Sequence, residues 1–159
     1  MTVTSTVDHQ PNSRRLGISL ISAVSRFGLA LVWLISGFQK MSDPLAFRQS
    51  VQAYELFPPE MVSLISTVLP PIELALGLLL LLGLFIVPAA AITALFMVCF
   101  IFGLASAAAR GLEINCGCFS AGEASSSSSL WLAILRDLLF LAMAGWVMKC
   151  PFTKFALHP

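Results

Sequence analysis

Apolar side chains are concentrated in four blocks, each long enough to cross a lipid bilayer as a helix. A spanning helix needs about 20 predominantly apolar residues. The stretch from Met61 to Ala109 is too long for one span, and the segment from Gly83 to Pro88 is the natural place to divide it. The pattern therefore predicts an all-α fold, a membrane-embedded four-helix bundle with spans at residues 16–38, 61–82, 86–109 and 130–148.

Two polar segments interrupt the apolar blocks on the same expected side of the membrane. In residues 39–60, Phe47, Val51 and Tyr54 recur at helical spacing, which predicts a short interfacial helix. Residues 110–129 form a long polar loop that ends in five serines, with Ser129 the expected N-cap of the last helix. Within the second span, Pro70 and Pro71 predict a kink.

Composition supports a membrane protein and argues against nucleic-acid binding. Hydrophobic residues make up 58% of the 159-residue chain and charged residues 11%, whereas soluble domains have about 25% charged residues. A net charge of +1 and the lack of a basic stripe give no nucleic-acid footprint. The lipid bilayer is thus the first expected partner.

The distribution of basic residues predicts the orientation. With four spans, both chain ends lie on one side, where we expect residues 1–15 to be a disordered cytosolic tail and residues 149–159 a second cytosolic tail. Basic residues near span ends mark the cytosol. The terminal side carries four of them and the opposite side three, so the polar loop is expected outside: the terminal set is Arg14, Arg15, Lys149 and Lys154, and the other is Lys40, Arg48 and Arg110.

The polar loop carries two cysteines separated by one glycine, Cys116-Gly117-Cys118. Glycine reaches positive φ without steric cost, so Gly117 allows the turn that a disulfide between the two would need. Such a small ring is strained, and strained, exposed disulfides are more often labile or catalytic. An extracytoplasmic loop lies in an oxidising compartment, which permits the bond.

Other interpretations of the cysteines remain open. A purely structural disulfide over so few residues removes little chain entropy, and no metal is expected because a structural zinc site needs about four ligands. Two inert thiols are the remaining possibility. Cys99 is expected to be a buried, small apolar residue within the third span, and Cys150 lies at the opposite membrane face.

Ionisable residues inside the spans are the other candidates for function. Glu73, Arg26, Arg136 and Asp137 are costly in hydrocarbon, so each should face the bundle interior and find a partner. Counting helical rise places Glu73 about 18 Å below the outer face and Arg26 about 12 Å above the inner one, which makes them an expected pair. Arg136, about 9 Å below the outer face, is a second candidate partner for Glu73.

These charges have two interpretations. They form either an ion pair that fixes helix packing or a polar pocket under the cysteine loop that binds a quinone or relays protons. Lys40 lies near the outer surface and would lower the pKa of the cysteines if it approached them.

Five short segments in order resemble the MauE/DoxX family of redox-associated membrane proteins, with the MauE branch the nearer match. They are Ser36-Gly37-Phe38-Gln39-Lys40, Tyr54-Glu55-Leu56-Phe57-Pro58, Leu69-Pro70-Pro71-Ile72-Glu73-Leu74, Asn115-Cys116-Gly117-Cys118-Phe119 and Leu135-Arg136-Asp137. The resemblance implies a four-helix bundle in the bacterial inner membrane. It also implies a role in methylamine utilisation, maturing the disulfide-rich small subunit of methylamine dehydrogenase with a periplasmic thioredoxin-like partner. Ser120 departs from the glycine usual after the Cys-Gly-Cys-Phe run.

The leading functional prediction is a thiol–disulfide redox component whose Cys116 and Cys118 exchange electrons with that thioredoxin-like protein. Two alternatives stay open: a non-catalytic assembly factor with a docking loop, and a quinone-linked membrane subunit of an oxidoreductase. No second cysteine pair lies at the right face to pass electrons onward. A quinone is therefore a possible cofactor and is not required by the sequence.

Overall fold

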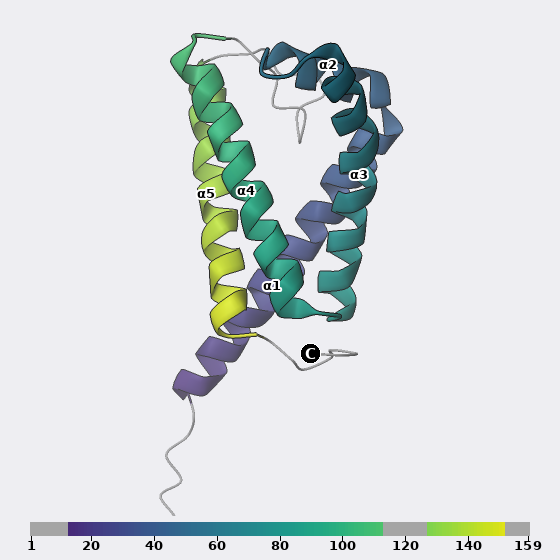
Figure 1. Cartoon of the computed structure of the whole chain (residues 1–159). Helices are drawn as coiled ribbons and strands as arrows, with labels where there is room; N and C mark the ends of the chain where they lie inside the picture. Colours follow the sequence, from purple (N-terminus) through teal and green to yellow (C-terminus); the bar gives the residue numbers. More distant parts are fainter. Residues whose placement is uncertain (1–12, 113–126, 152–159) are drawn as a thin grey trace, which may run out of the picture.

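The computed structural model describes residues 13–112 and 127–151, which fold into five helices (Figure 1). The helices are α1 (Ser13–Ser42), α2 (Pro44–Ala53), α3 (Pro59–Leu82), α4 (Ile86–Ala109) and α5 (Ser127–Lys149). The predicted all-α membrane fold is confirmed. The loop bearing Cys116, Gly117 and Cys118 lies outside the described residues.

Four of these helices are long and apolar enough to cross a membrane, and their bounds differ little from the expected ones. The candidate spans are Gly17–Ser42, Pro59–Leu82, Ile86–Ala109 and Trp131–Lys149. The first helix continues through Ser42, past the expected end at Phe38. The last begins at Ser127, so Ser129 lies inside its first turn and the expected N-cap there is wrong.

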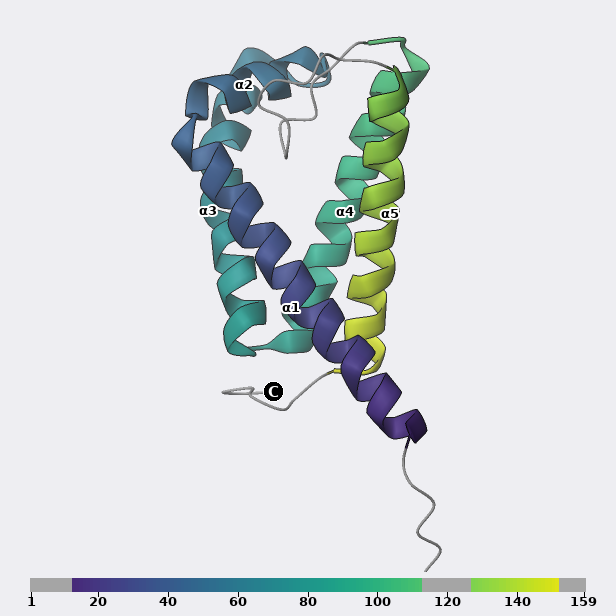
Figure 2. The ribbon, with the colours of Figure 1, turned by 180° about the vertical axis from the view of Figure 1, so that it is seen from behind.

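The short helix α2 lies across one end of the bundle, as the amphipathic spacing predicted (Figures 1 and 2). Asp43 caps its start by accepting a hydrogen bond from the backbone N–H of Ala46 at 3.0 Å, and Pro44 occupies the first turn, where its missing N–H costs nothing. Phe47 and Val51 are buried and pack with Val62 of α3. This apolar face fixes α2 against the start of α3.

The four long helices form two closely packed pairs, α1 with α3 and α4 with α5. Figures 1 and 2 show the pairs drawing apart toward the end that α2 covers, while α1 crosses to reach α5 near the opposite end. The main apolar core includes Leu29, Trp33, Leu80, Ile86 and Ala144.

Two glycines allow the backbones of α1 and α3 to approach closely. A Cβ on Gly77 would lie 2.8 Å from Leu34 Cγ and 3.0 Å from Ala30 O, and a Cβ on Gly37 would lie 3.0 Å from Pro70 O. A side chain at either position would force neighbouring atoms to shift. Small residues at such positions are the usual means of packing helices in membranes, where lipid provides little hydrophobic drive for association.

The second span, α3, runs as one helix through Pro70 and Pro71 to Leu82 and is capped by Gly83. Gly83 adopts φ 71°, and the Leu84 N–H donates to Leu79 O at 2.9 Å, which closes the last turn before α4 begins. The turn lies where the glycine and proline pattern placed it. At the other end, Arg110 Nη2 donates to Tyr54 O at 2.5 Å and joins the end of α4 to the end of α2.

Candidate functional site

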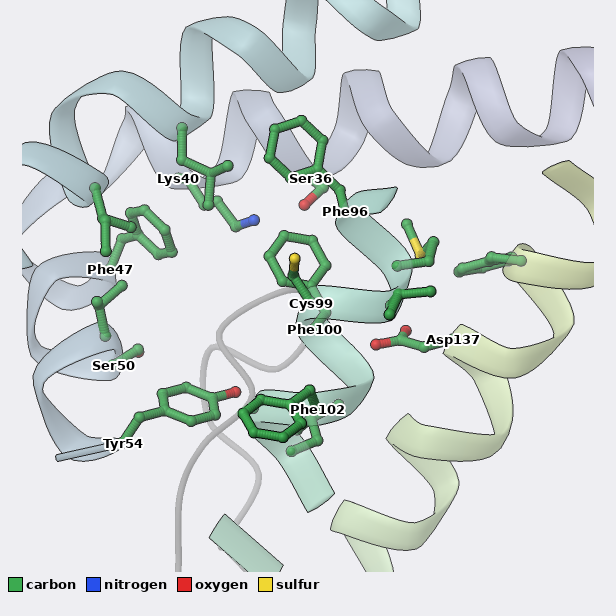
Figure 3. A pocket seen from close by; sticks show the side chains of 18 of the residues that line it. Ser36, Lys40, Phe47, Ser50, Tyr54, Phe96, Cys99, Phe100, Phe102 and Asp137 are labelled. Atoms are coloured by element: carbon green, nitrogen blue, oxygen red, sulfur yellow. The ribbon is translucent and has the colours of Figure 1, made fainter. Parts of the chain in front are cut away.

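A cavity of about 770 Å³ lies between the two helix pairs on the α2 side, and all five helices contribute to its wall (Figure 3). Most of the lining is apolar and much of it aromatic, including side chains of α2 and α4. Six charged or hydroxyl side chains interrupt this wall. They are Ser36 and Lys40 from α1, Ser50 from α2, Tyr54 directly after α2, and Arg136 and Asp137 from α5. The cavity therefore combines an apolar interior with polar groups on several of its walls.

Lys40 and Glu73 form a buried ion pair at one wall of this cavity. The Lys40 ammonium contacts Glu73 Oε1, and Ser36 Oγ donates to Glu73 Oε2 at 3.1 Å. The exposed fraction of the side chain is 2% for Lys40 and 0% for Glu73. Ser36 and Lys40 are one helical turn apart, so both point at α3. The carboxylate is thus held by two donors from α1.

Aromatic rings complete the surroundings of the Lys40 ammonium. Its nitrogen lies 5.0 Å from the ring centroid of Phe47 and 5.4 Å from that of Phe100. Both distances fall within the range of cation–π attraction. Lys40 lies in the last turn of α1, and its side chain is buried among α2, α3 and α4.

The structure also corrects the expected partner of Glu73, since Arg26 binds elsewhere. Arg26 Nε donates to Leu80 O at 2.7 Å and Nη2 to Leu81 O at 3.0 Å. These carbonyls belong to the last turn of α3, where helical carbonyls have no partner within the helix and the dipole is negative. Arg26 therefore caps α3, and its guanidinium also lies 5.0 Å from the Phe27 ring centroid.

Arg136 is likewise not the partner of Glu73. It pairs with its neighbour Asp137, whose Oδ1 accepts from Arg136 Nε at 3.1 Å and from Nη2 at 3.0 Å. The Asp137 side chain is 6% exposed and that of Arg136 29%. The expectation that the charged residues face inward holds for Asp137, which lines the cavity opposite α1.

Of the cysteines, the structure describes Cys99 and Cys150. Cys99 was expected to be buried, but it is exposed on α4 and lines the cavity. The sequence could not show this because α4 is apolar on every side, so no amphipathic pattern marks its inner face. Cys150 follows the last turn of α5, at the end away from α2.

Sequence reasoning missed the residues that tie α1 to the other helices by hydrogen bonds. Trp33 Nε1 donates to Thr93 Oγ1 of α4 at 3.1 Å, and Trp146 Nε1 donates to Ser22 Oγ of α1 at 3.1 Å. The signal that was available is the presence of isolated hydroxyl residues in otherwise apolar spans, since a buried hydroxyl needs a partner.

Over residues 13–112 and 127–151, no cluster of three or more His, Cys, Asp or Glu side chains is placed to hold a metal ion. The chemistry of the cavity is that of two ion pairs, hydroxyls and aromatic faces. Such a wall can bind an apolar molecule that carries one or two hydrogen-bonding oxygens.

The fold and cavity define a multi-pass helical membrane protein with a cavity that contains charged and hydroxyl groups at one end of the bundle. The chain belongs to the family described as Methylamine utilisation protein MauE, which it matches over residues 18–149.

One relative is the Methylamine utilization protein MauE of Paracoccus denitrificans, with 32% identity over 120 residues. The match covers 75% of this chain and 63% of the relative's length. No solved structure matches the chain.

Proposed function

We propose that this protein is a membrane component of methylamine utilisation that exchanges disulfides through Cys116 and Cys118. Its partner would be a periplasmic thioredoxin-like protein, and the pathway would mature a disulfide-rich periplasmic enzyme such as methylamine dehydrogenase. Support comes from the MauE family membership and from the relative whose name assigns it to methylamine utilisation. The Cys-Gly-Cys spacing supplies the chemistry.

One structural observation carries the placement of this chemistry. The end of α4 and the start of α5 lie at the end of the bundle covered by α2 (Figure 1), and residues of α2 line the cavity. Leu112 packs there with Tyr54 and Leu104. Cys116 is four residues further along the chain, a reach of at most about 14 Å. This short reach supports the placement of the cysteine chemistry at the cavity end.

The start of α1 and the end of α5 lie at the opposite end of the bundle (Figure 1). In our proposal that end faces the cytosol and the cysteine loop faces the periplasm of a bacterial cell membrane, which agrees with the distribution of basic residues. A reporter fused after Pro159 should be active in the cytosol. Activity of a fusion restricted to the periplasm would reverse the orientation.

The exchange itself needs two steps. The thiolate of one cysteine attacks a disulfide of the partner, so that one partner sulfur leaves as thiolate and a mixed disulfide forms. The second cysteine then attacks its neighbour's sulfur, which releases the reduced partner and leaves the Cys116–Cys118 disulfide. Two electrons have passed to the partner, and the same steps run backward when the partner is the reductant.

Replacing Cys118 by Ser tests the proposal, because it removes the group that resolves a mixed disulfide formed at Cys116. Cells quenched with acid and alkylated should yield a reducible adduct with a periplasmic protein, and Cys116→Ser should be examined in the same way. Cys150→Ser is the matched control and should trap nothing. If neither loop variant yields an adduct and the native pair never changes redox state, the exchange is refuted and a docking loop is the better account.

A further inference from the structure

We propose that the cavity between the two helix pairs binds a lipid-soluble quinone, with a ring oxygen accepting a hydrogen bond from Lys40 and the ring lying among the aromatic side chains. The quinone tail would leave the bundle toward the lipid. The class of ligand follows from the size of the cavity, its lining and the position of its charges.

The cavity suits a ring-bearing lipid in size and position. Its volume of about 770 Å³ is within the roughly 300–1,000 Å³ typical of small-molecule sites. It lies among membrane-spanning helices, and residues at its edge face outward: Phe102 is 70% exposed and Val98 51%. A ligand dissolved in the bilayer can therefore enter without passing through water.

The wall offers flat aromatic faces beside hydrogen-bonding groups. Figure 3 shows the Lys40 nitrogen directed into the cavity, near Phe47 and Phe100, with the Asp137 carboxylate on the far wall. An ammonium group has three protons to donate, and Glu73 accepts one of them. A quinone carries two oxygens on opposite edges of a planar ring, so it can use a donor on one wall while its ring stacks on aromatic side chains.

An acyl chain fits the same cavity less well. Ionisable groups inside a membrane are costly to maintain and commonly mark sites for polar or charged ligands. A hydrocarbon tail would make no use of Lys40 or Asp137, whereas a quinone accepts from the ammonium and the corresponding quinol can donate a hydroxyl proton to a carboxylate. The lining therefore favours a lipid with oxygens on its ring.

The consequence for redox chemistry rests on the proposed function of the cysteine pair. If Cys116 and Cys118 are reduced by their partner, a bound quinone is the missing oxidant. The two thiols become a disulfide and the quinone becomes a quinol, which takes up both electrons and both protons. This supplies the onward acceptor for which the sequence holds no second cysteine pair.

Cys99 provides a native probe of occupancy that does not depend on the loop cysteines. In full-length protein with Cys116, Cys118 and Cys150 replaced by Ser, the rate of Cys99 alkylation by N-ethylmaleimide is measured in detergent by mass spectrometry, with and without decylubiquinone. At a quinone concentration about ten times its dissociation constant, mass action predicts about tenfold slower alkylation.

A second single-cysteine protein controls for quinone dissolved in the micelle. It carries Leu95→Cys and Cys99→Ser in the same background, because Leu95 is 63% exposed on α4 and does not line the cavity. Its alkylation rate should not change with quinone. Equal slowing at both positions, or no slowing at Cys99, would overturn the proposal.

Filling the cavity should abolish the protection. Ser50→Phe adds a ring at a cavity-lining position of α2, while Ala46→Phe adds the same ring at an exposed position on that helix outside the lining. Only Ser50→Phe should remove the effect of quinone on Cys99. Loss of protection in both variants, or equal protection by oleic acid, would show that the cavity is not a quinone site.

These outcomes are separable from those of the proposed exchange. Protection of Cys99 by quinone together with failure to trap a partner would leave the quinone site intact and refute the thiol exchange. A trapped partner without protection would do the reverse.

Discussion

The Lys40–Glu73 pair allows the energetic role of buried charge in this bundle to be measured with a double-mutant cycle. The two side chains are 2% and 0% exposed, so neither charge can turn to water when its partner is removed. Lys40→Met leaves a buried carboxylate, and Glu73→Gln leaves a buried ammonium while retaining an acceptor for Ser36. Breaking a buried pair from one side costs about 3–5 kcal/mol.

The double variant Lys40→Met/Glu73→Gln removes both charges and should lose less stability than either single variant. Independent effects would instead add to a loss of about 6–10 kcal/mol. The difference arises because each single variant mainly measures the penalty of an uncompensated charge. Replacing a whole buried pair by neutral groups of similar size is often close to neutral.

The free energy of unfolding would be measured by titrating sodium dodecyl sulfate into mixed micelles and following helicity by circular dichroism. Arg48→Met and Glu60→Gln provide a control cycle, since both residues are exposed in the bundle. Exposed charges contribute about 0–1 kcal/mol, so their variants should be nearly additive. Additive losses at Lys40 and Glu73 would refute the conclusion that each single variant leaves an uncompensated buried charge.

Three further variants test the packing of α1. Gly77→Ala should lower the free energy of unfolding by about 1–3 kcal/mol, because its Cβ would meet backbone atoms of Leu34 and Ala30. Gly145→Ala is the control, since a Cβ there meets open space. It should be neutral or stabilising in the same titration. Arg26→Met should speed amide hydrogen exchange at the end of α3. It should also lower the free energy of unfolding by about 1–3 kcal/mol, because hydrogen bonds from a charged group are lost. Unchanged exchange at the end of α3 would contradict the capping role of Arg26. Trp33→Phe should lower the free energy of unfolding by at least about 1 kcal/mol, because it removes the hydrogen bond to Thr93. The same substitution should cost less in a protein that already carries Thr93→Val. An equal loss in that background would argue against the hydrogen bond.

The helices could be predicted from sequence because apolar blocks of spanning length leave few alternatives in a bilayer. The short helix before α3 was equally clear, since Phe47 and Val51 alternate with polar residues at helical spacing and are the residues that the structure buries. The α3–α4 turn followed from Gly83, whose positive φ ends the helix.

The partners of the buried charges were not predictable by counting helical rise. Rise gives the depth of a Cα atom, but a helical side chain leans toward the N-terminus of its helix, so Lys40 reaches back from the end of α1 into the bundle. Arg26 binds backbone carbonyls of Leu80 and Leu81. Every residue has such a carbonyl, so the sequence contains no residue type that identifies this partner of Arg26.

The cavity was only partly foreseen. A polar pocket under the cysteine loop was one of two interpretations of the membrane charges, and the structure places Lys40 and Asp137 around a real cavity at that end. The aromatic wall could not be anticipated, because Phe96, Phe100 and Phe102 lie on a helix without polar periodicity. Which of its faces meets the cavity depends on its packing against α5.

The position of the groups that bind Arg26 and Lys40 also bears on how the chain enters the membrane. The Leu80 and Leu81 carbonyls and the Glu73 carboxylate all lie on α3, which is synthesised after α1. A cationic side chain near the centre of a lone helix adds about 2.5–3.5 kcal/mol to its insertion cost. The first helix should therefore wait at the translocon until α3 emerges, so that the two enter the bilayer together as a preassembled pair.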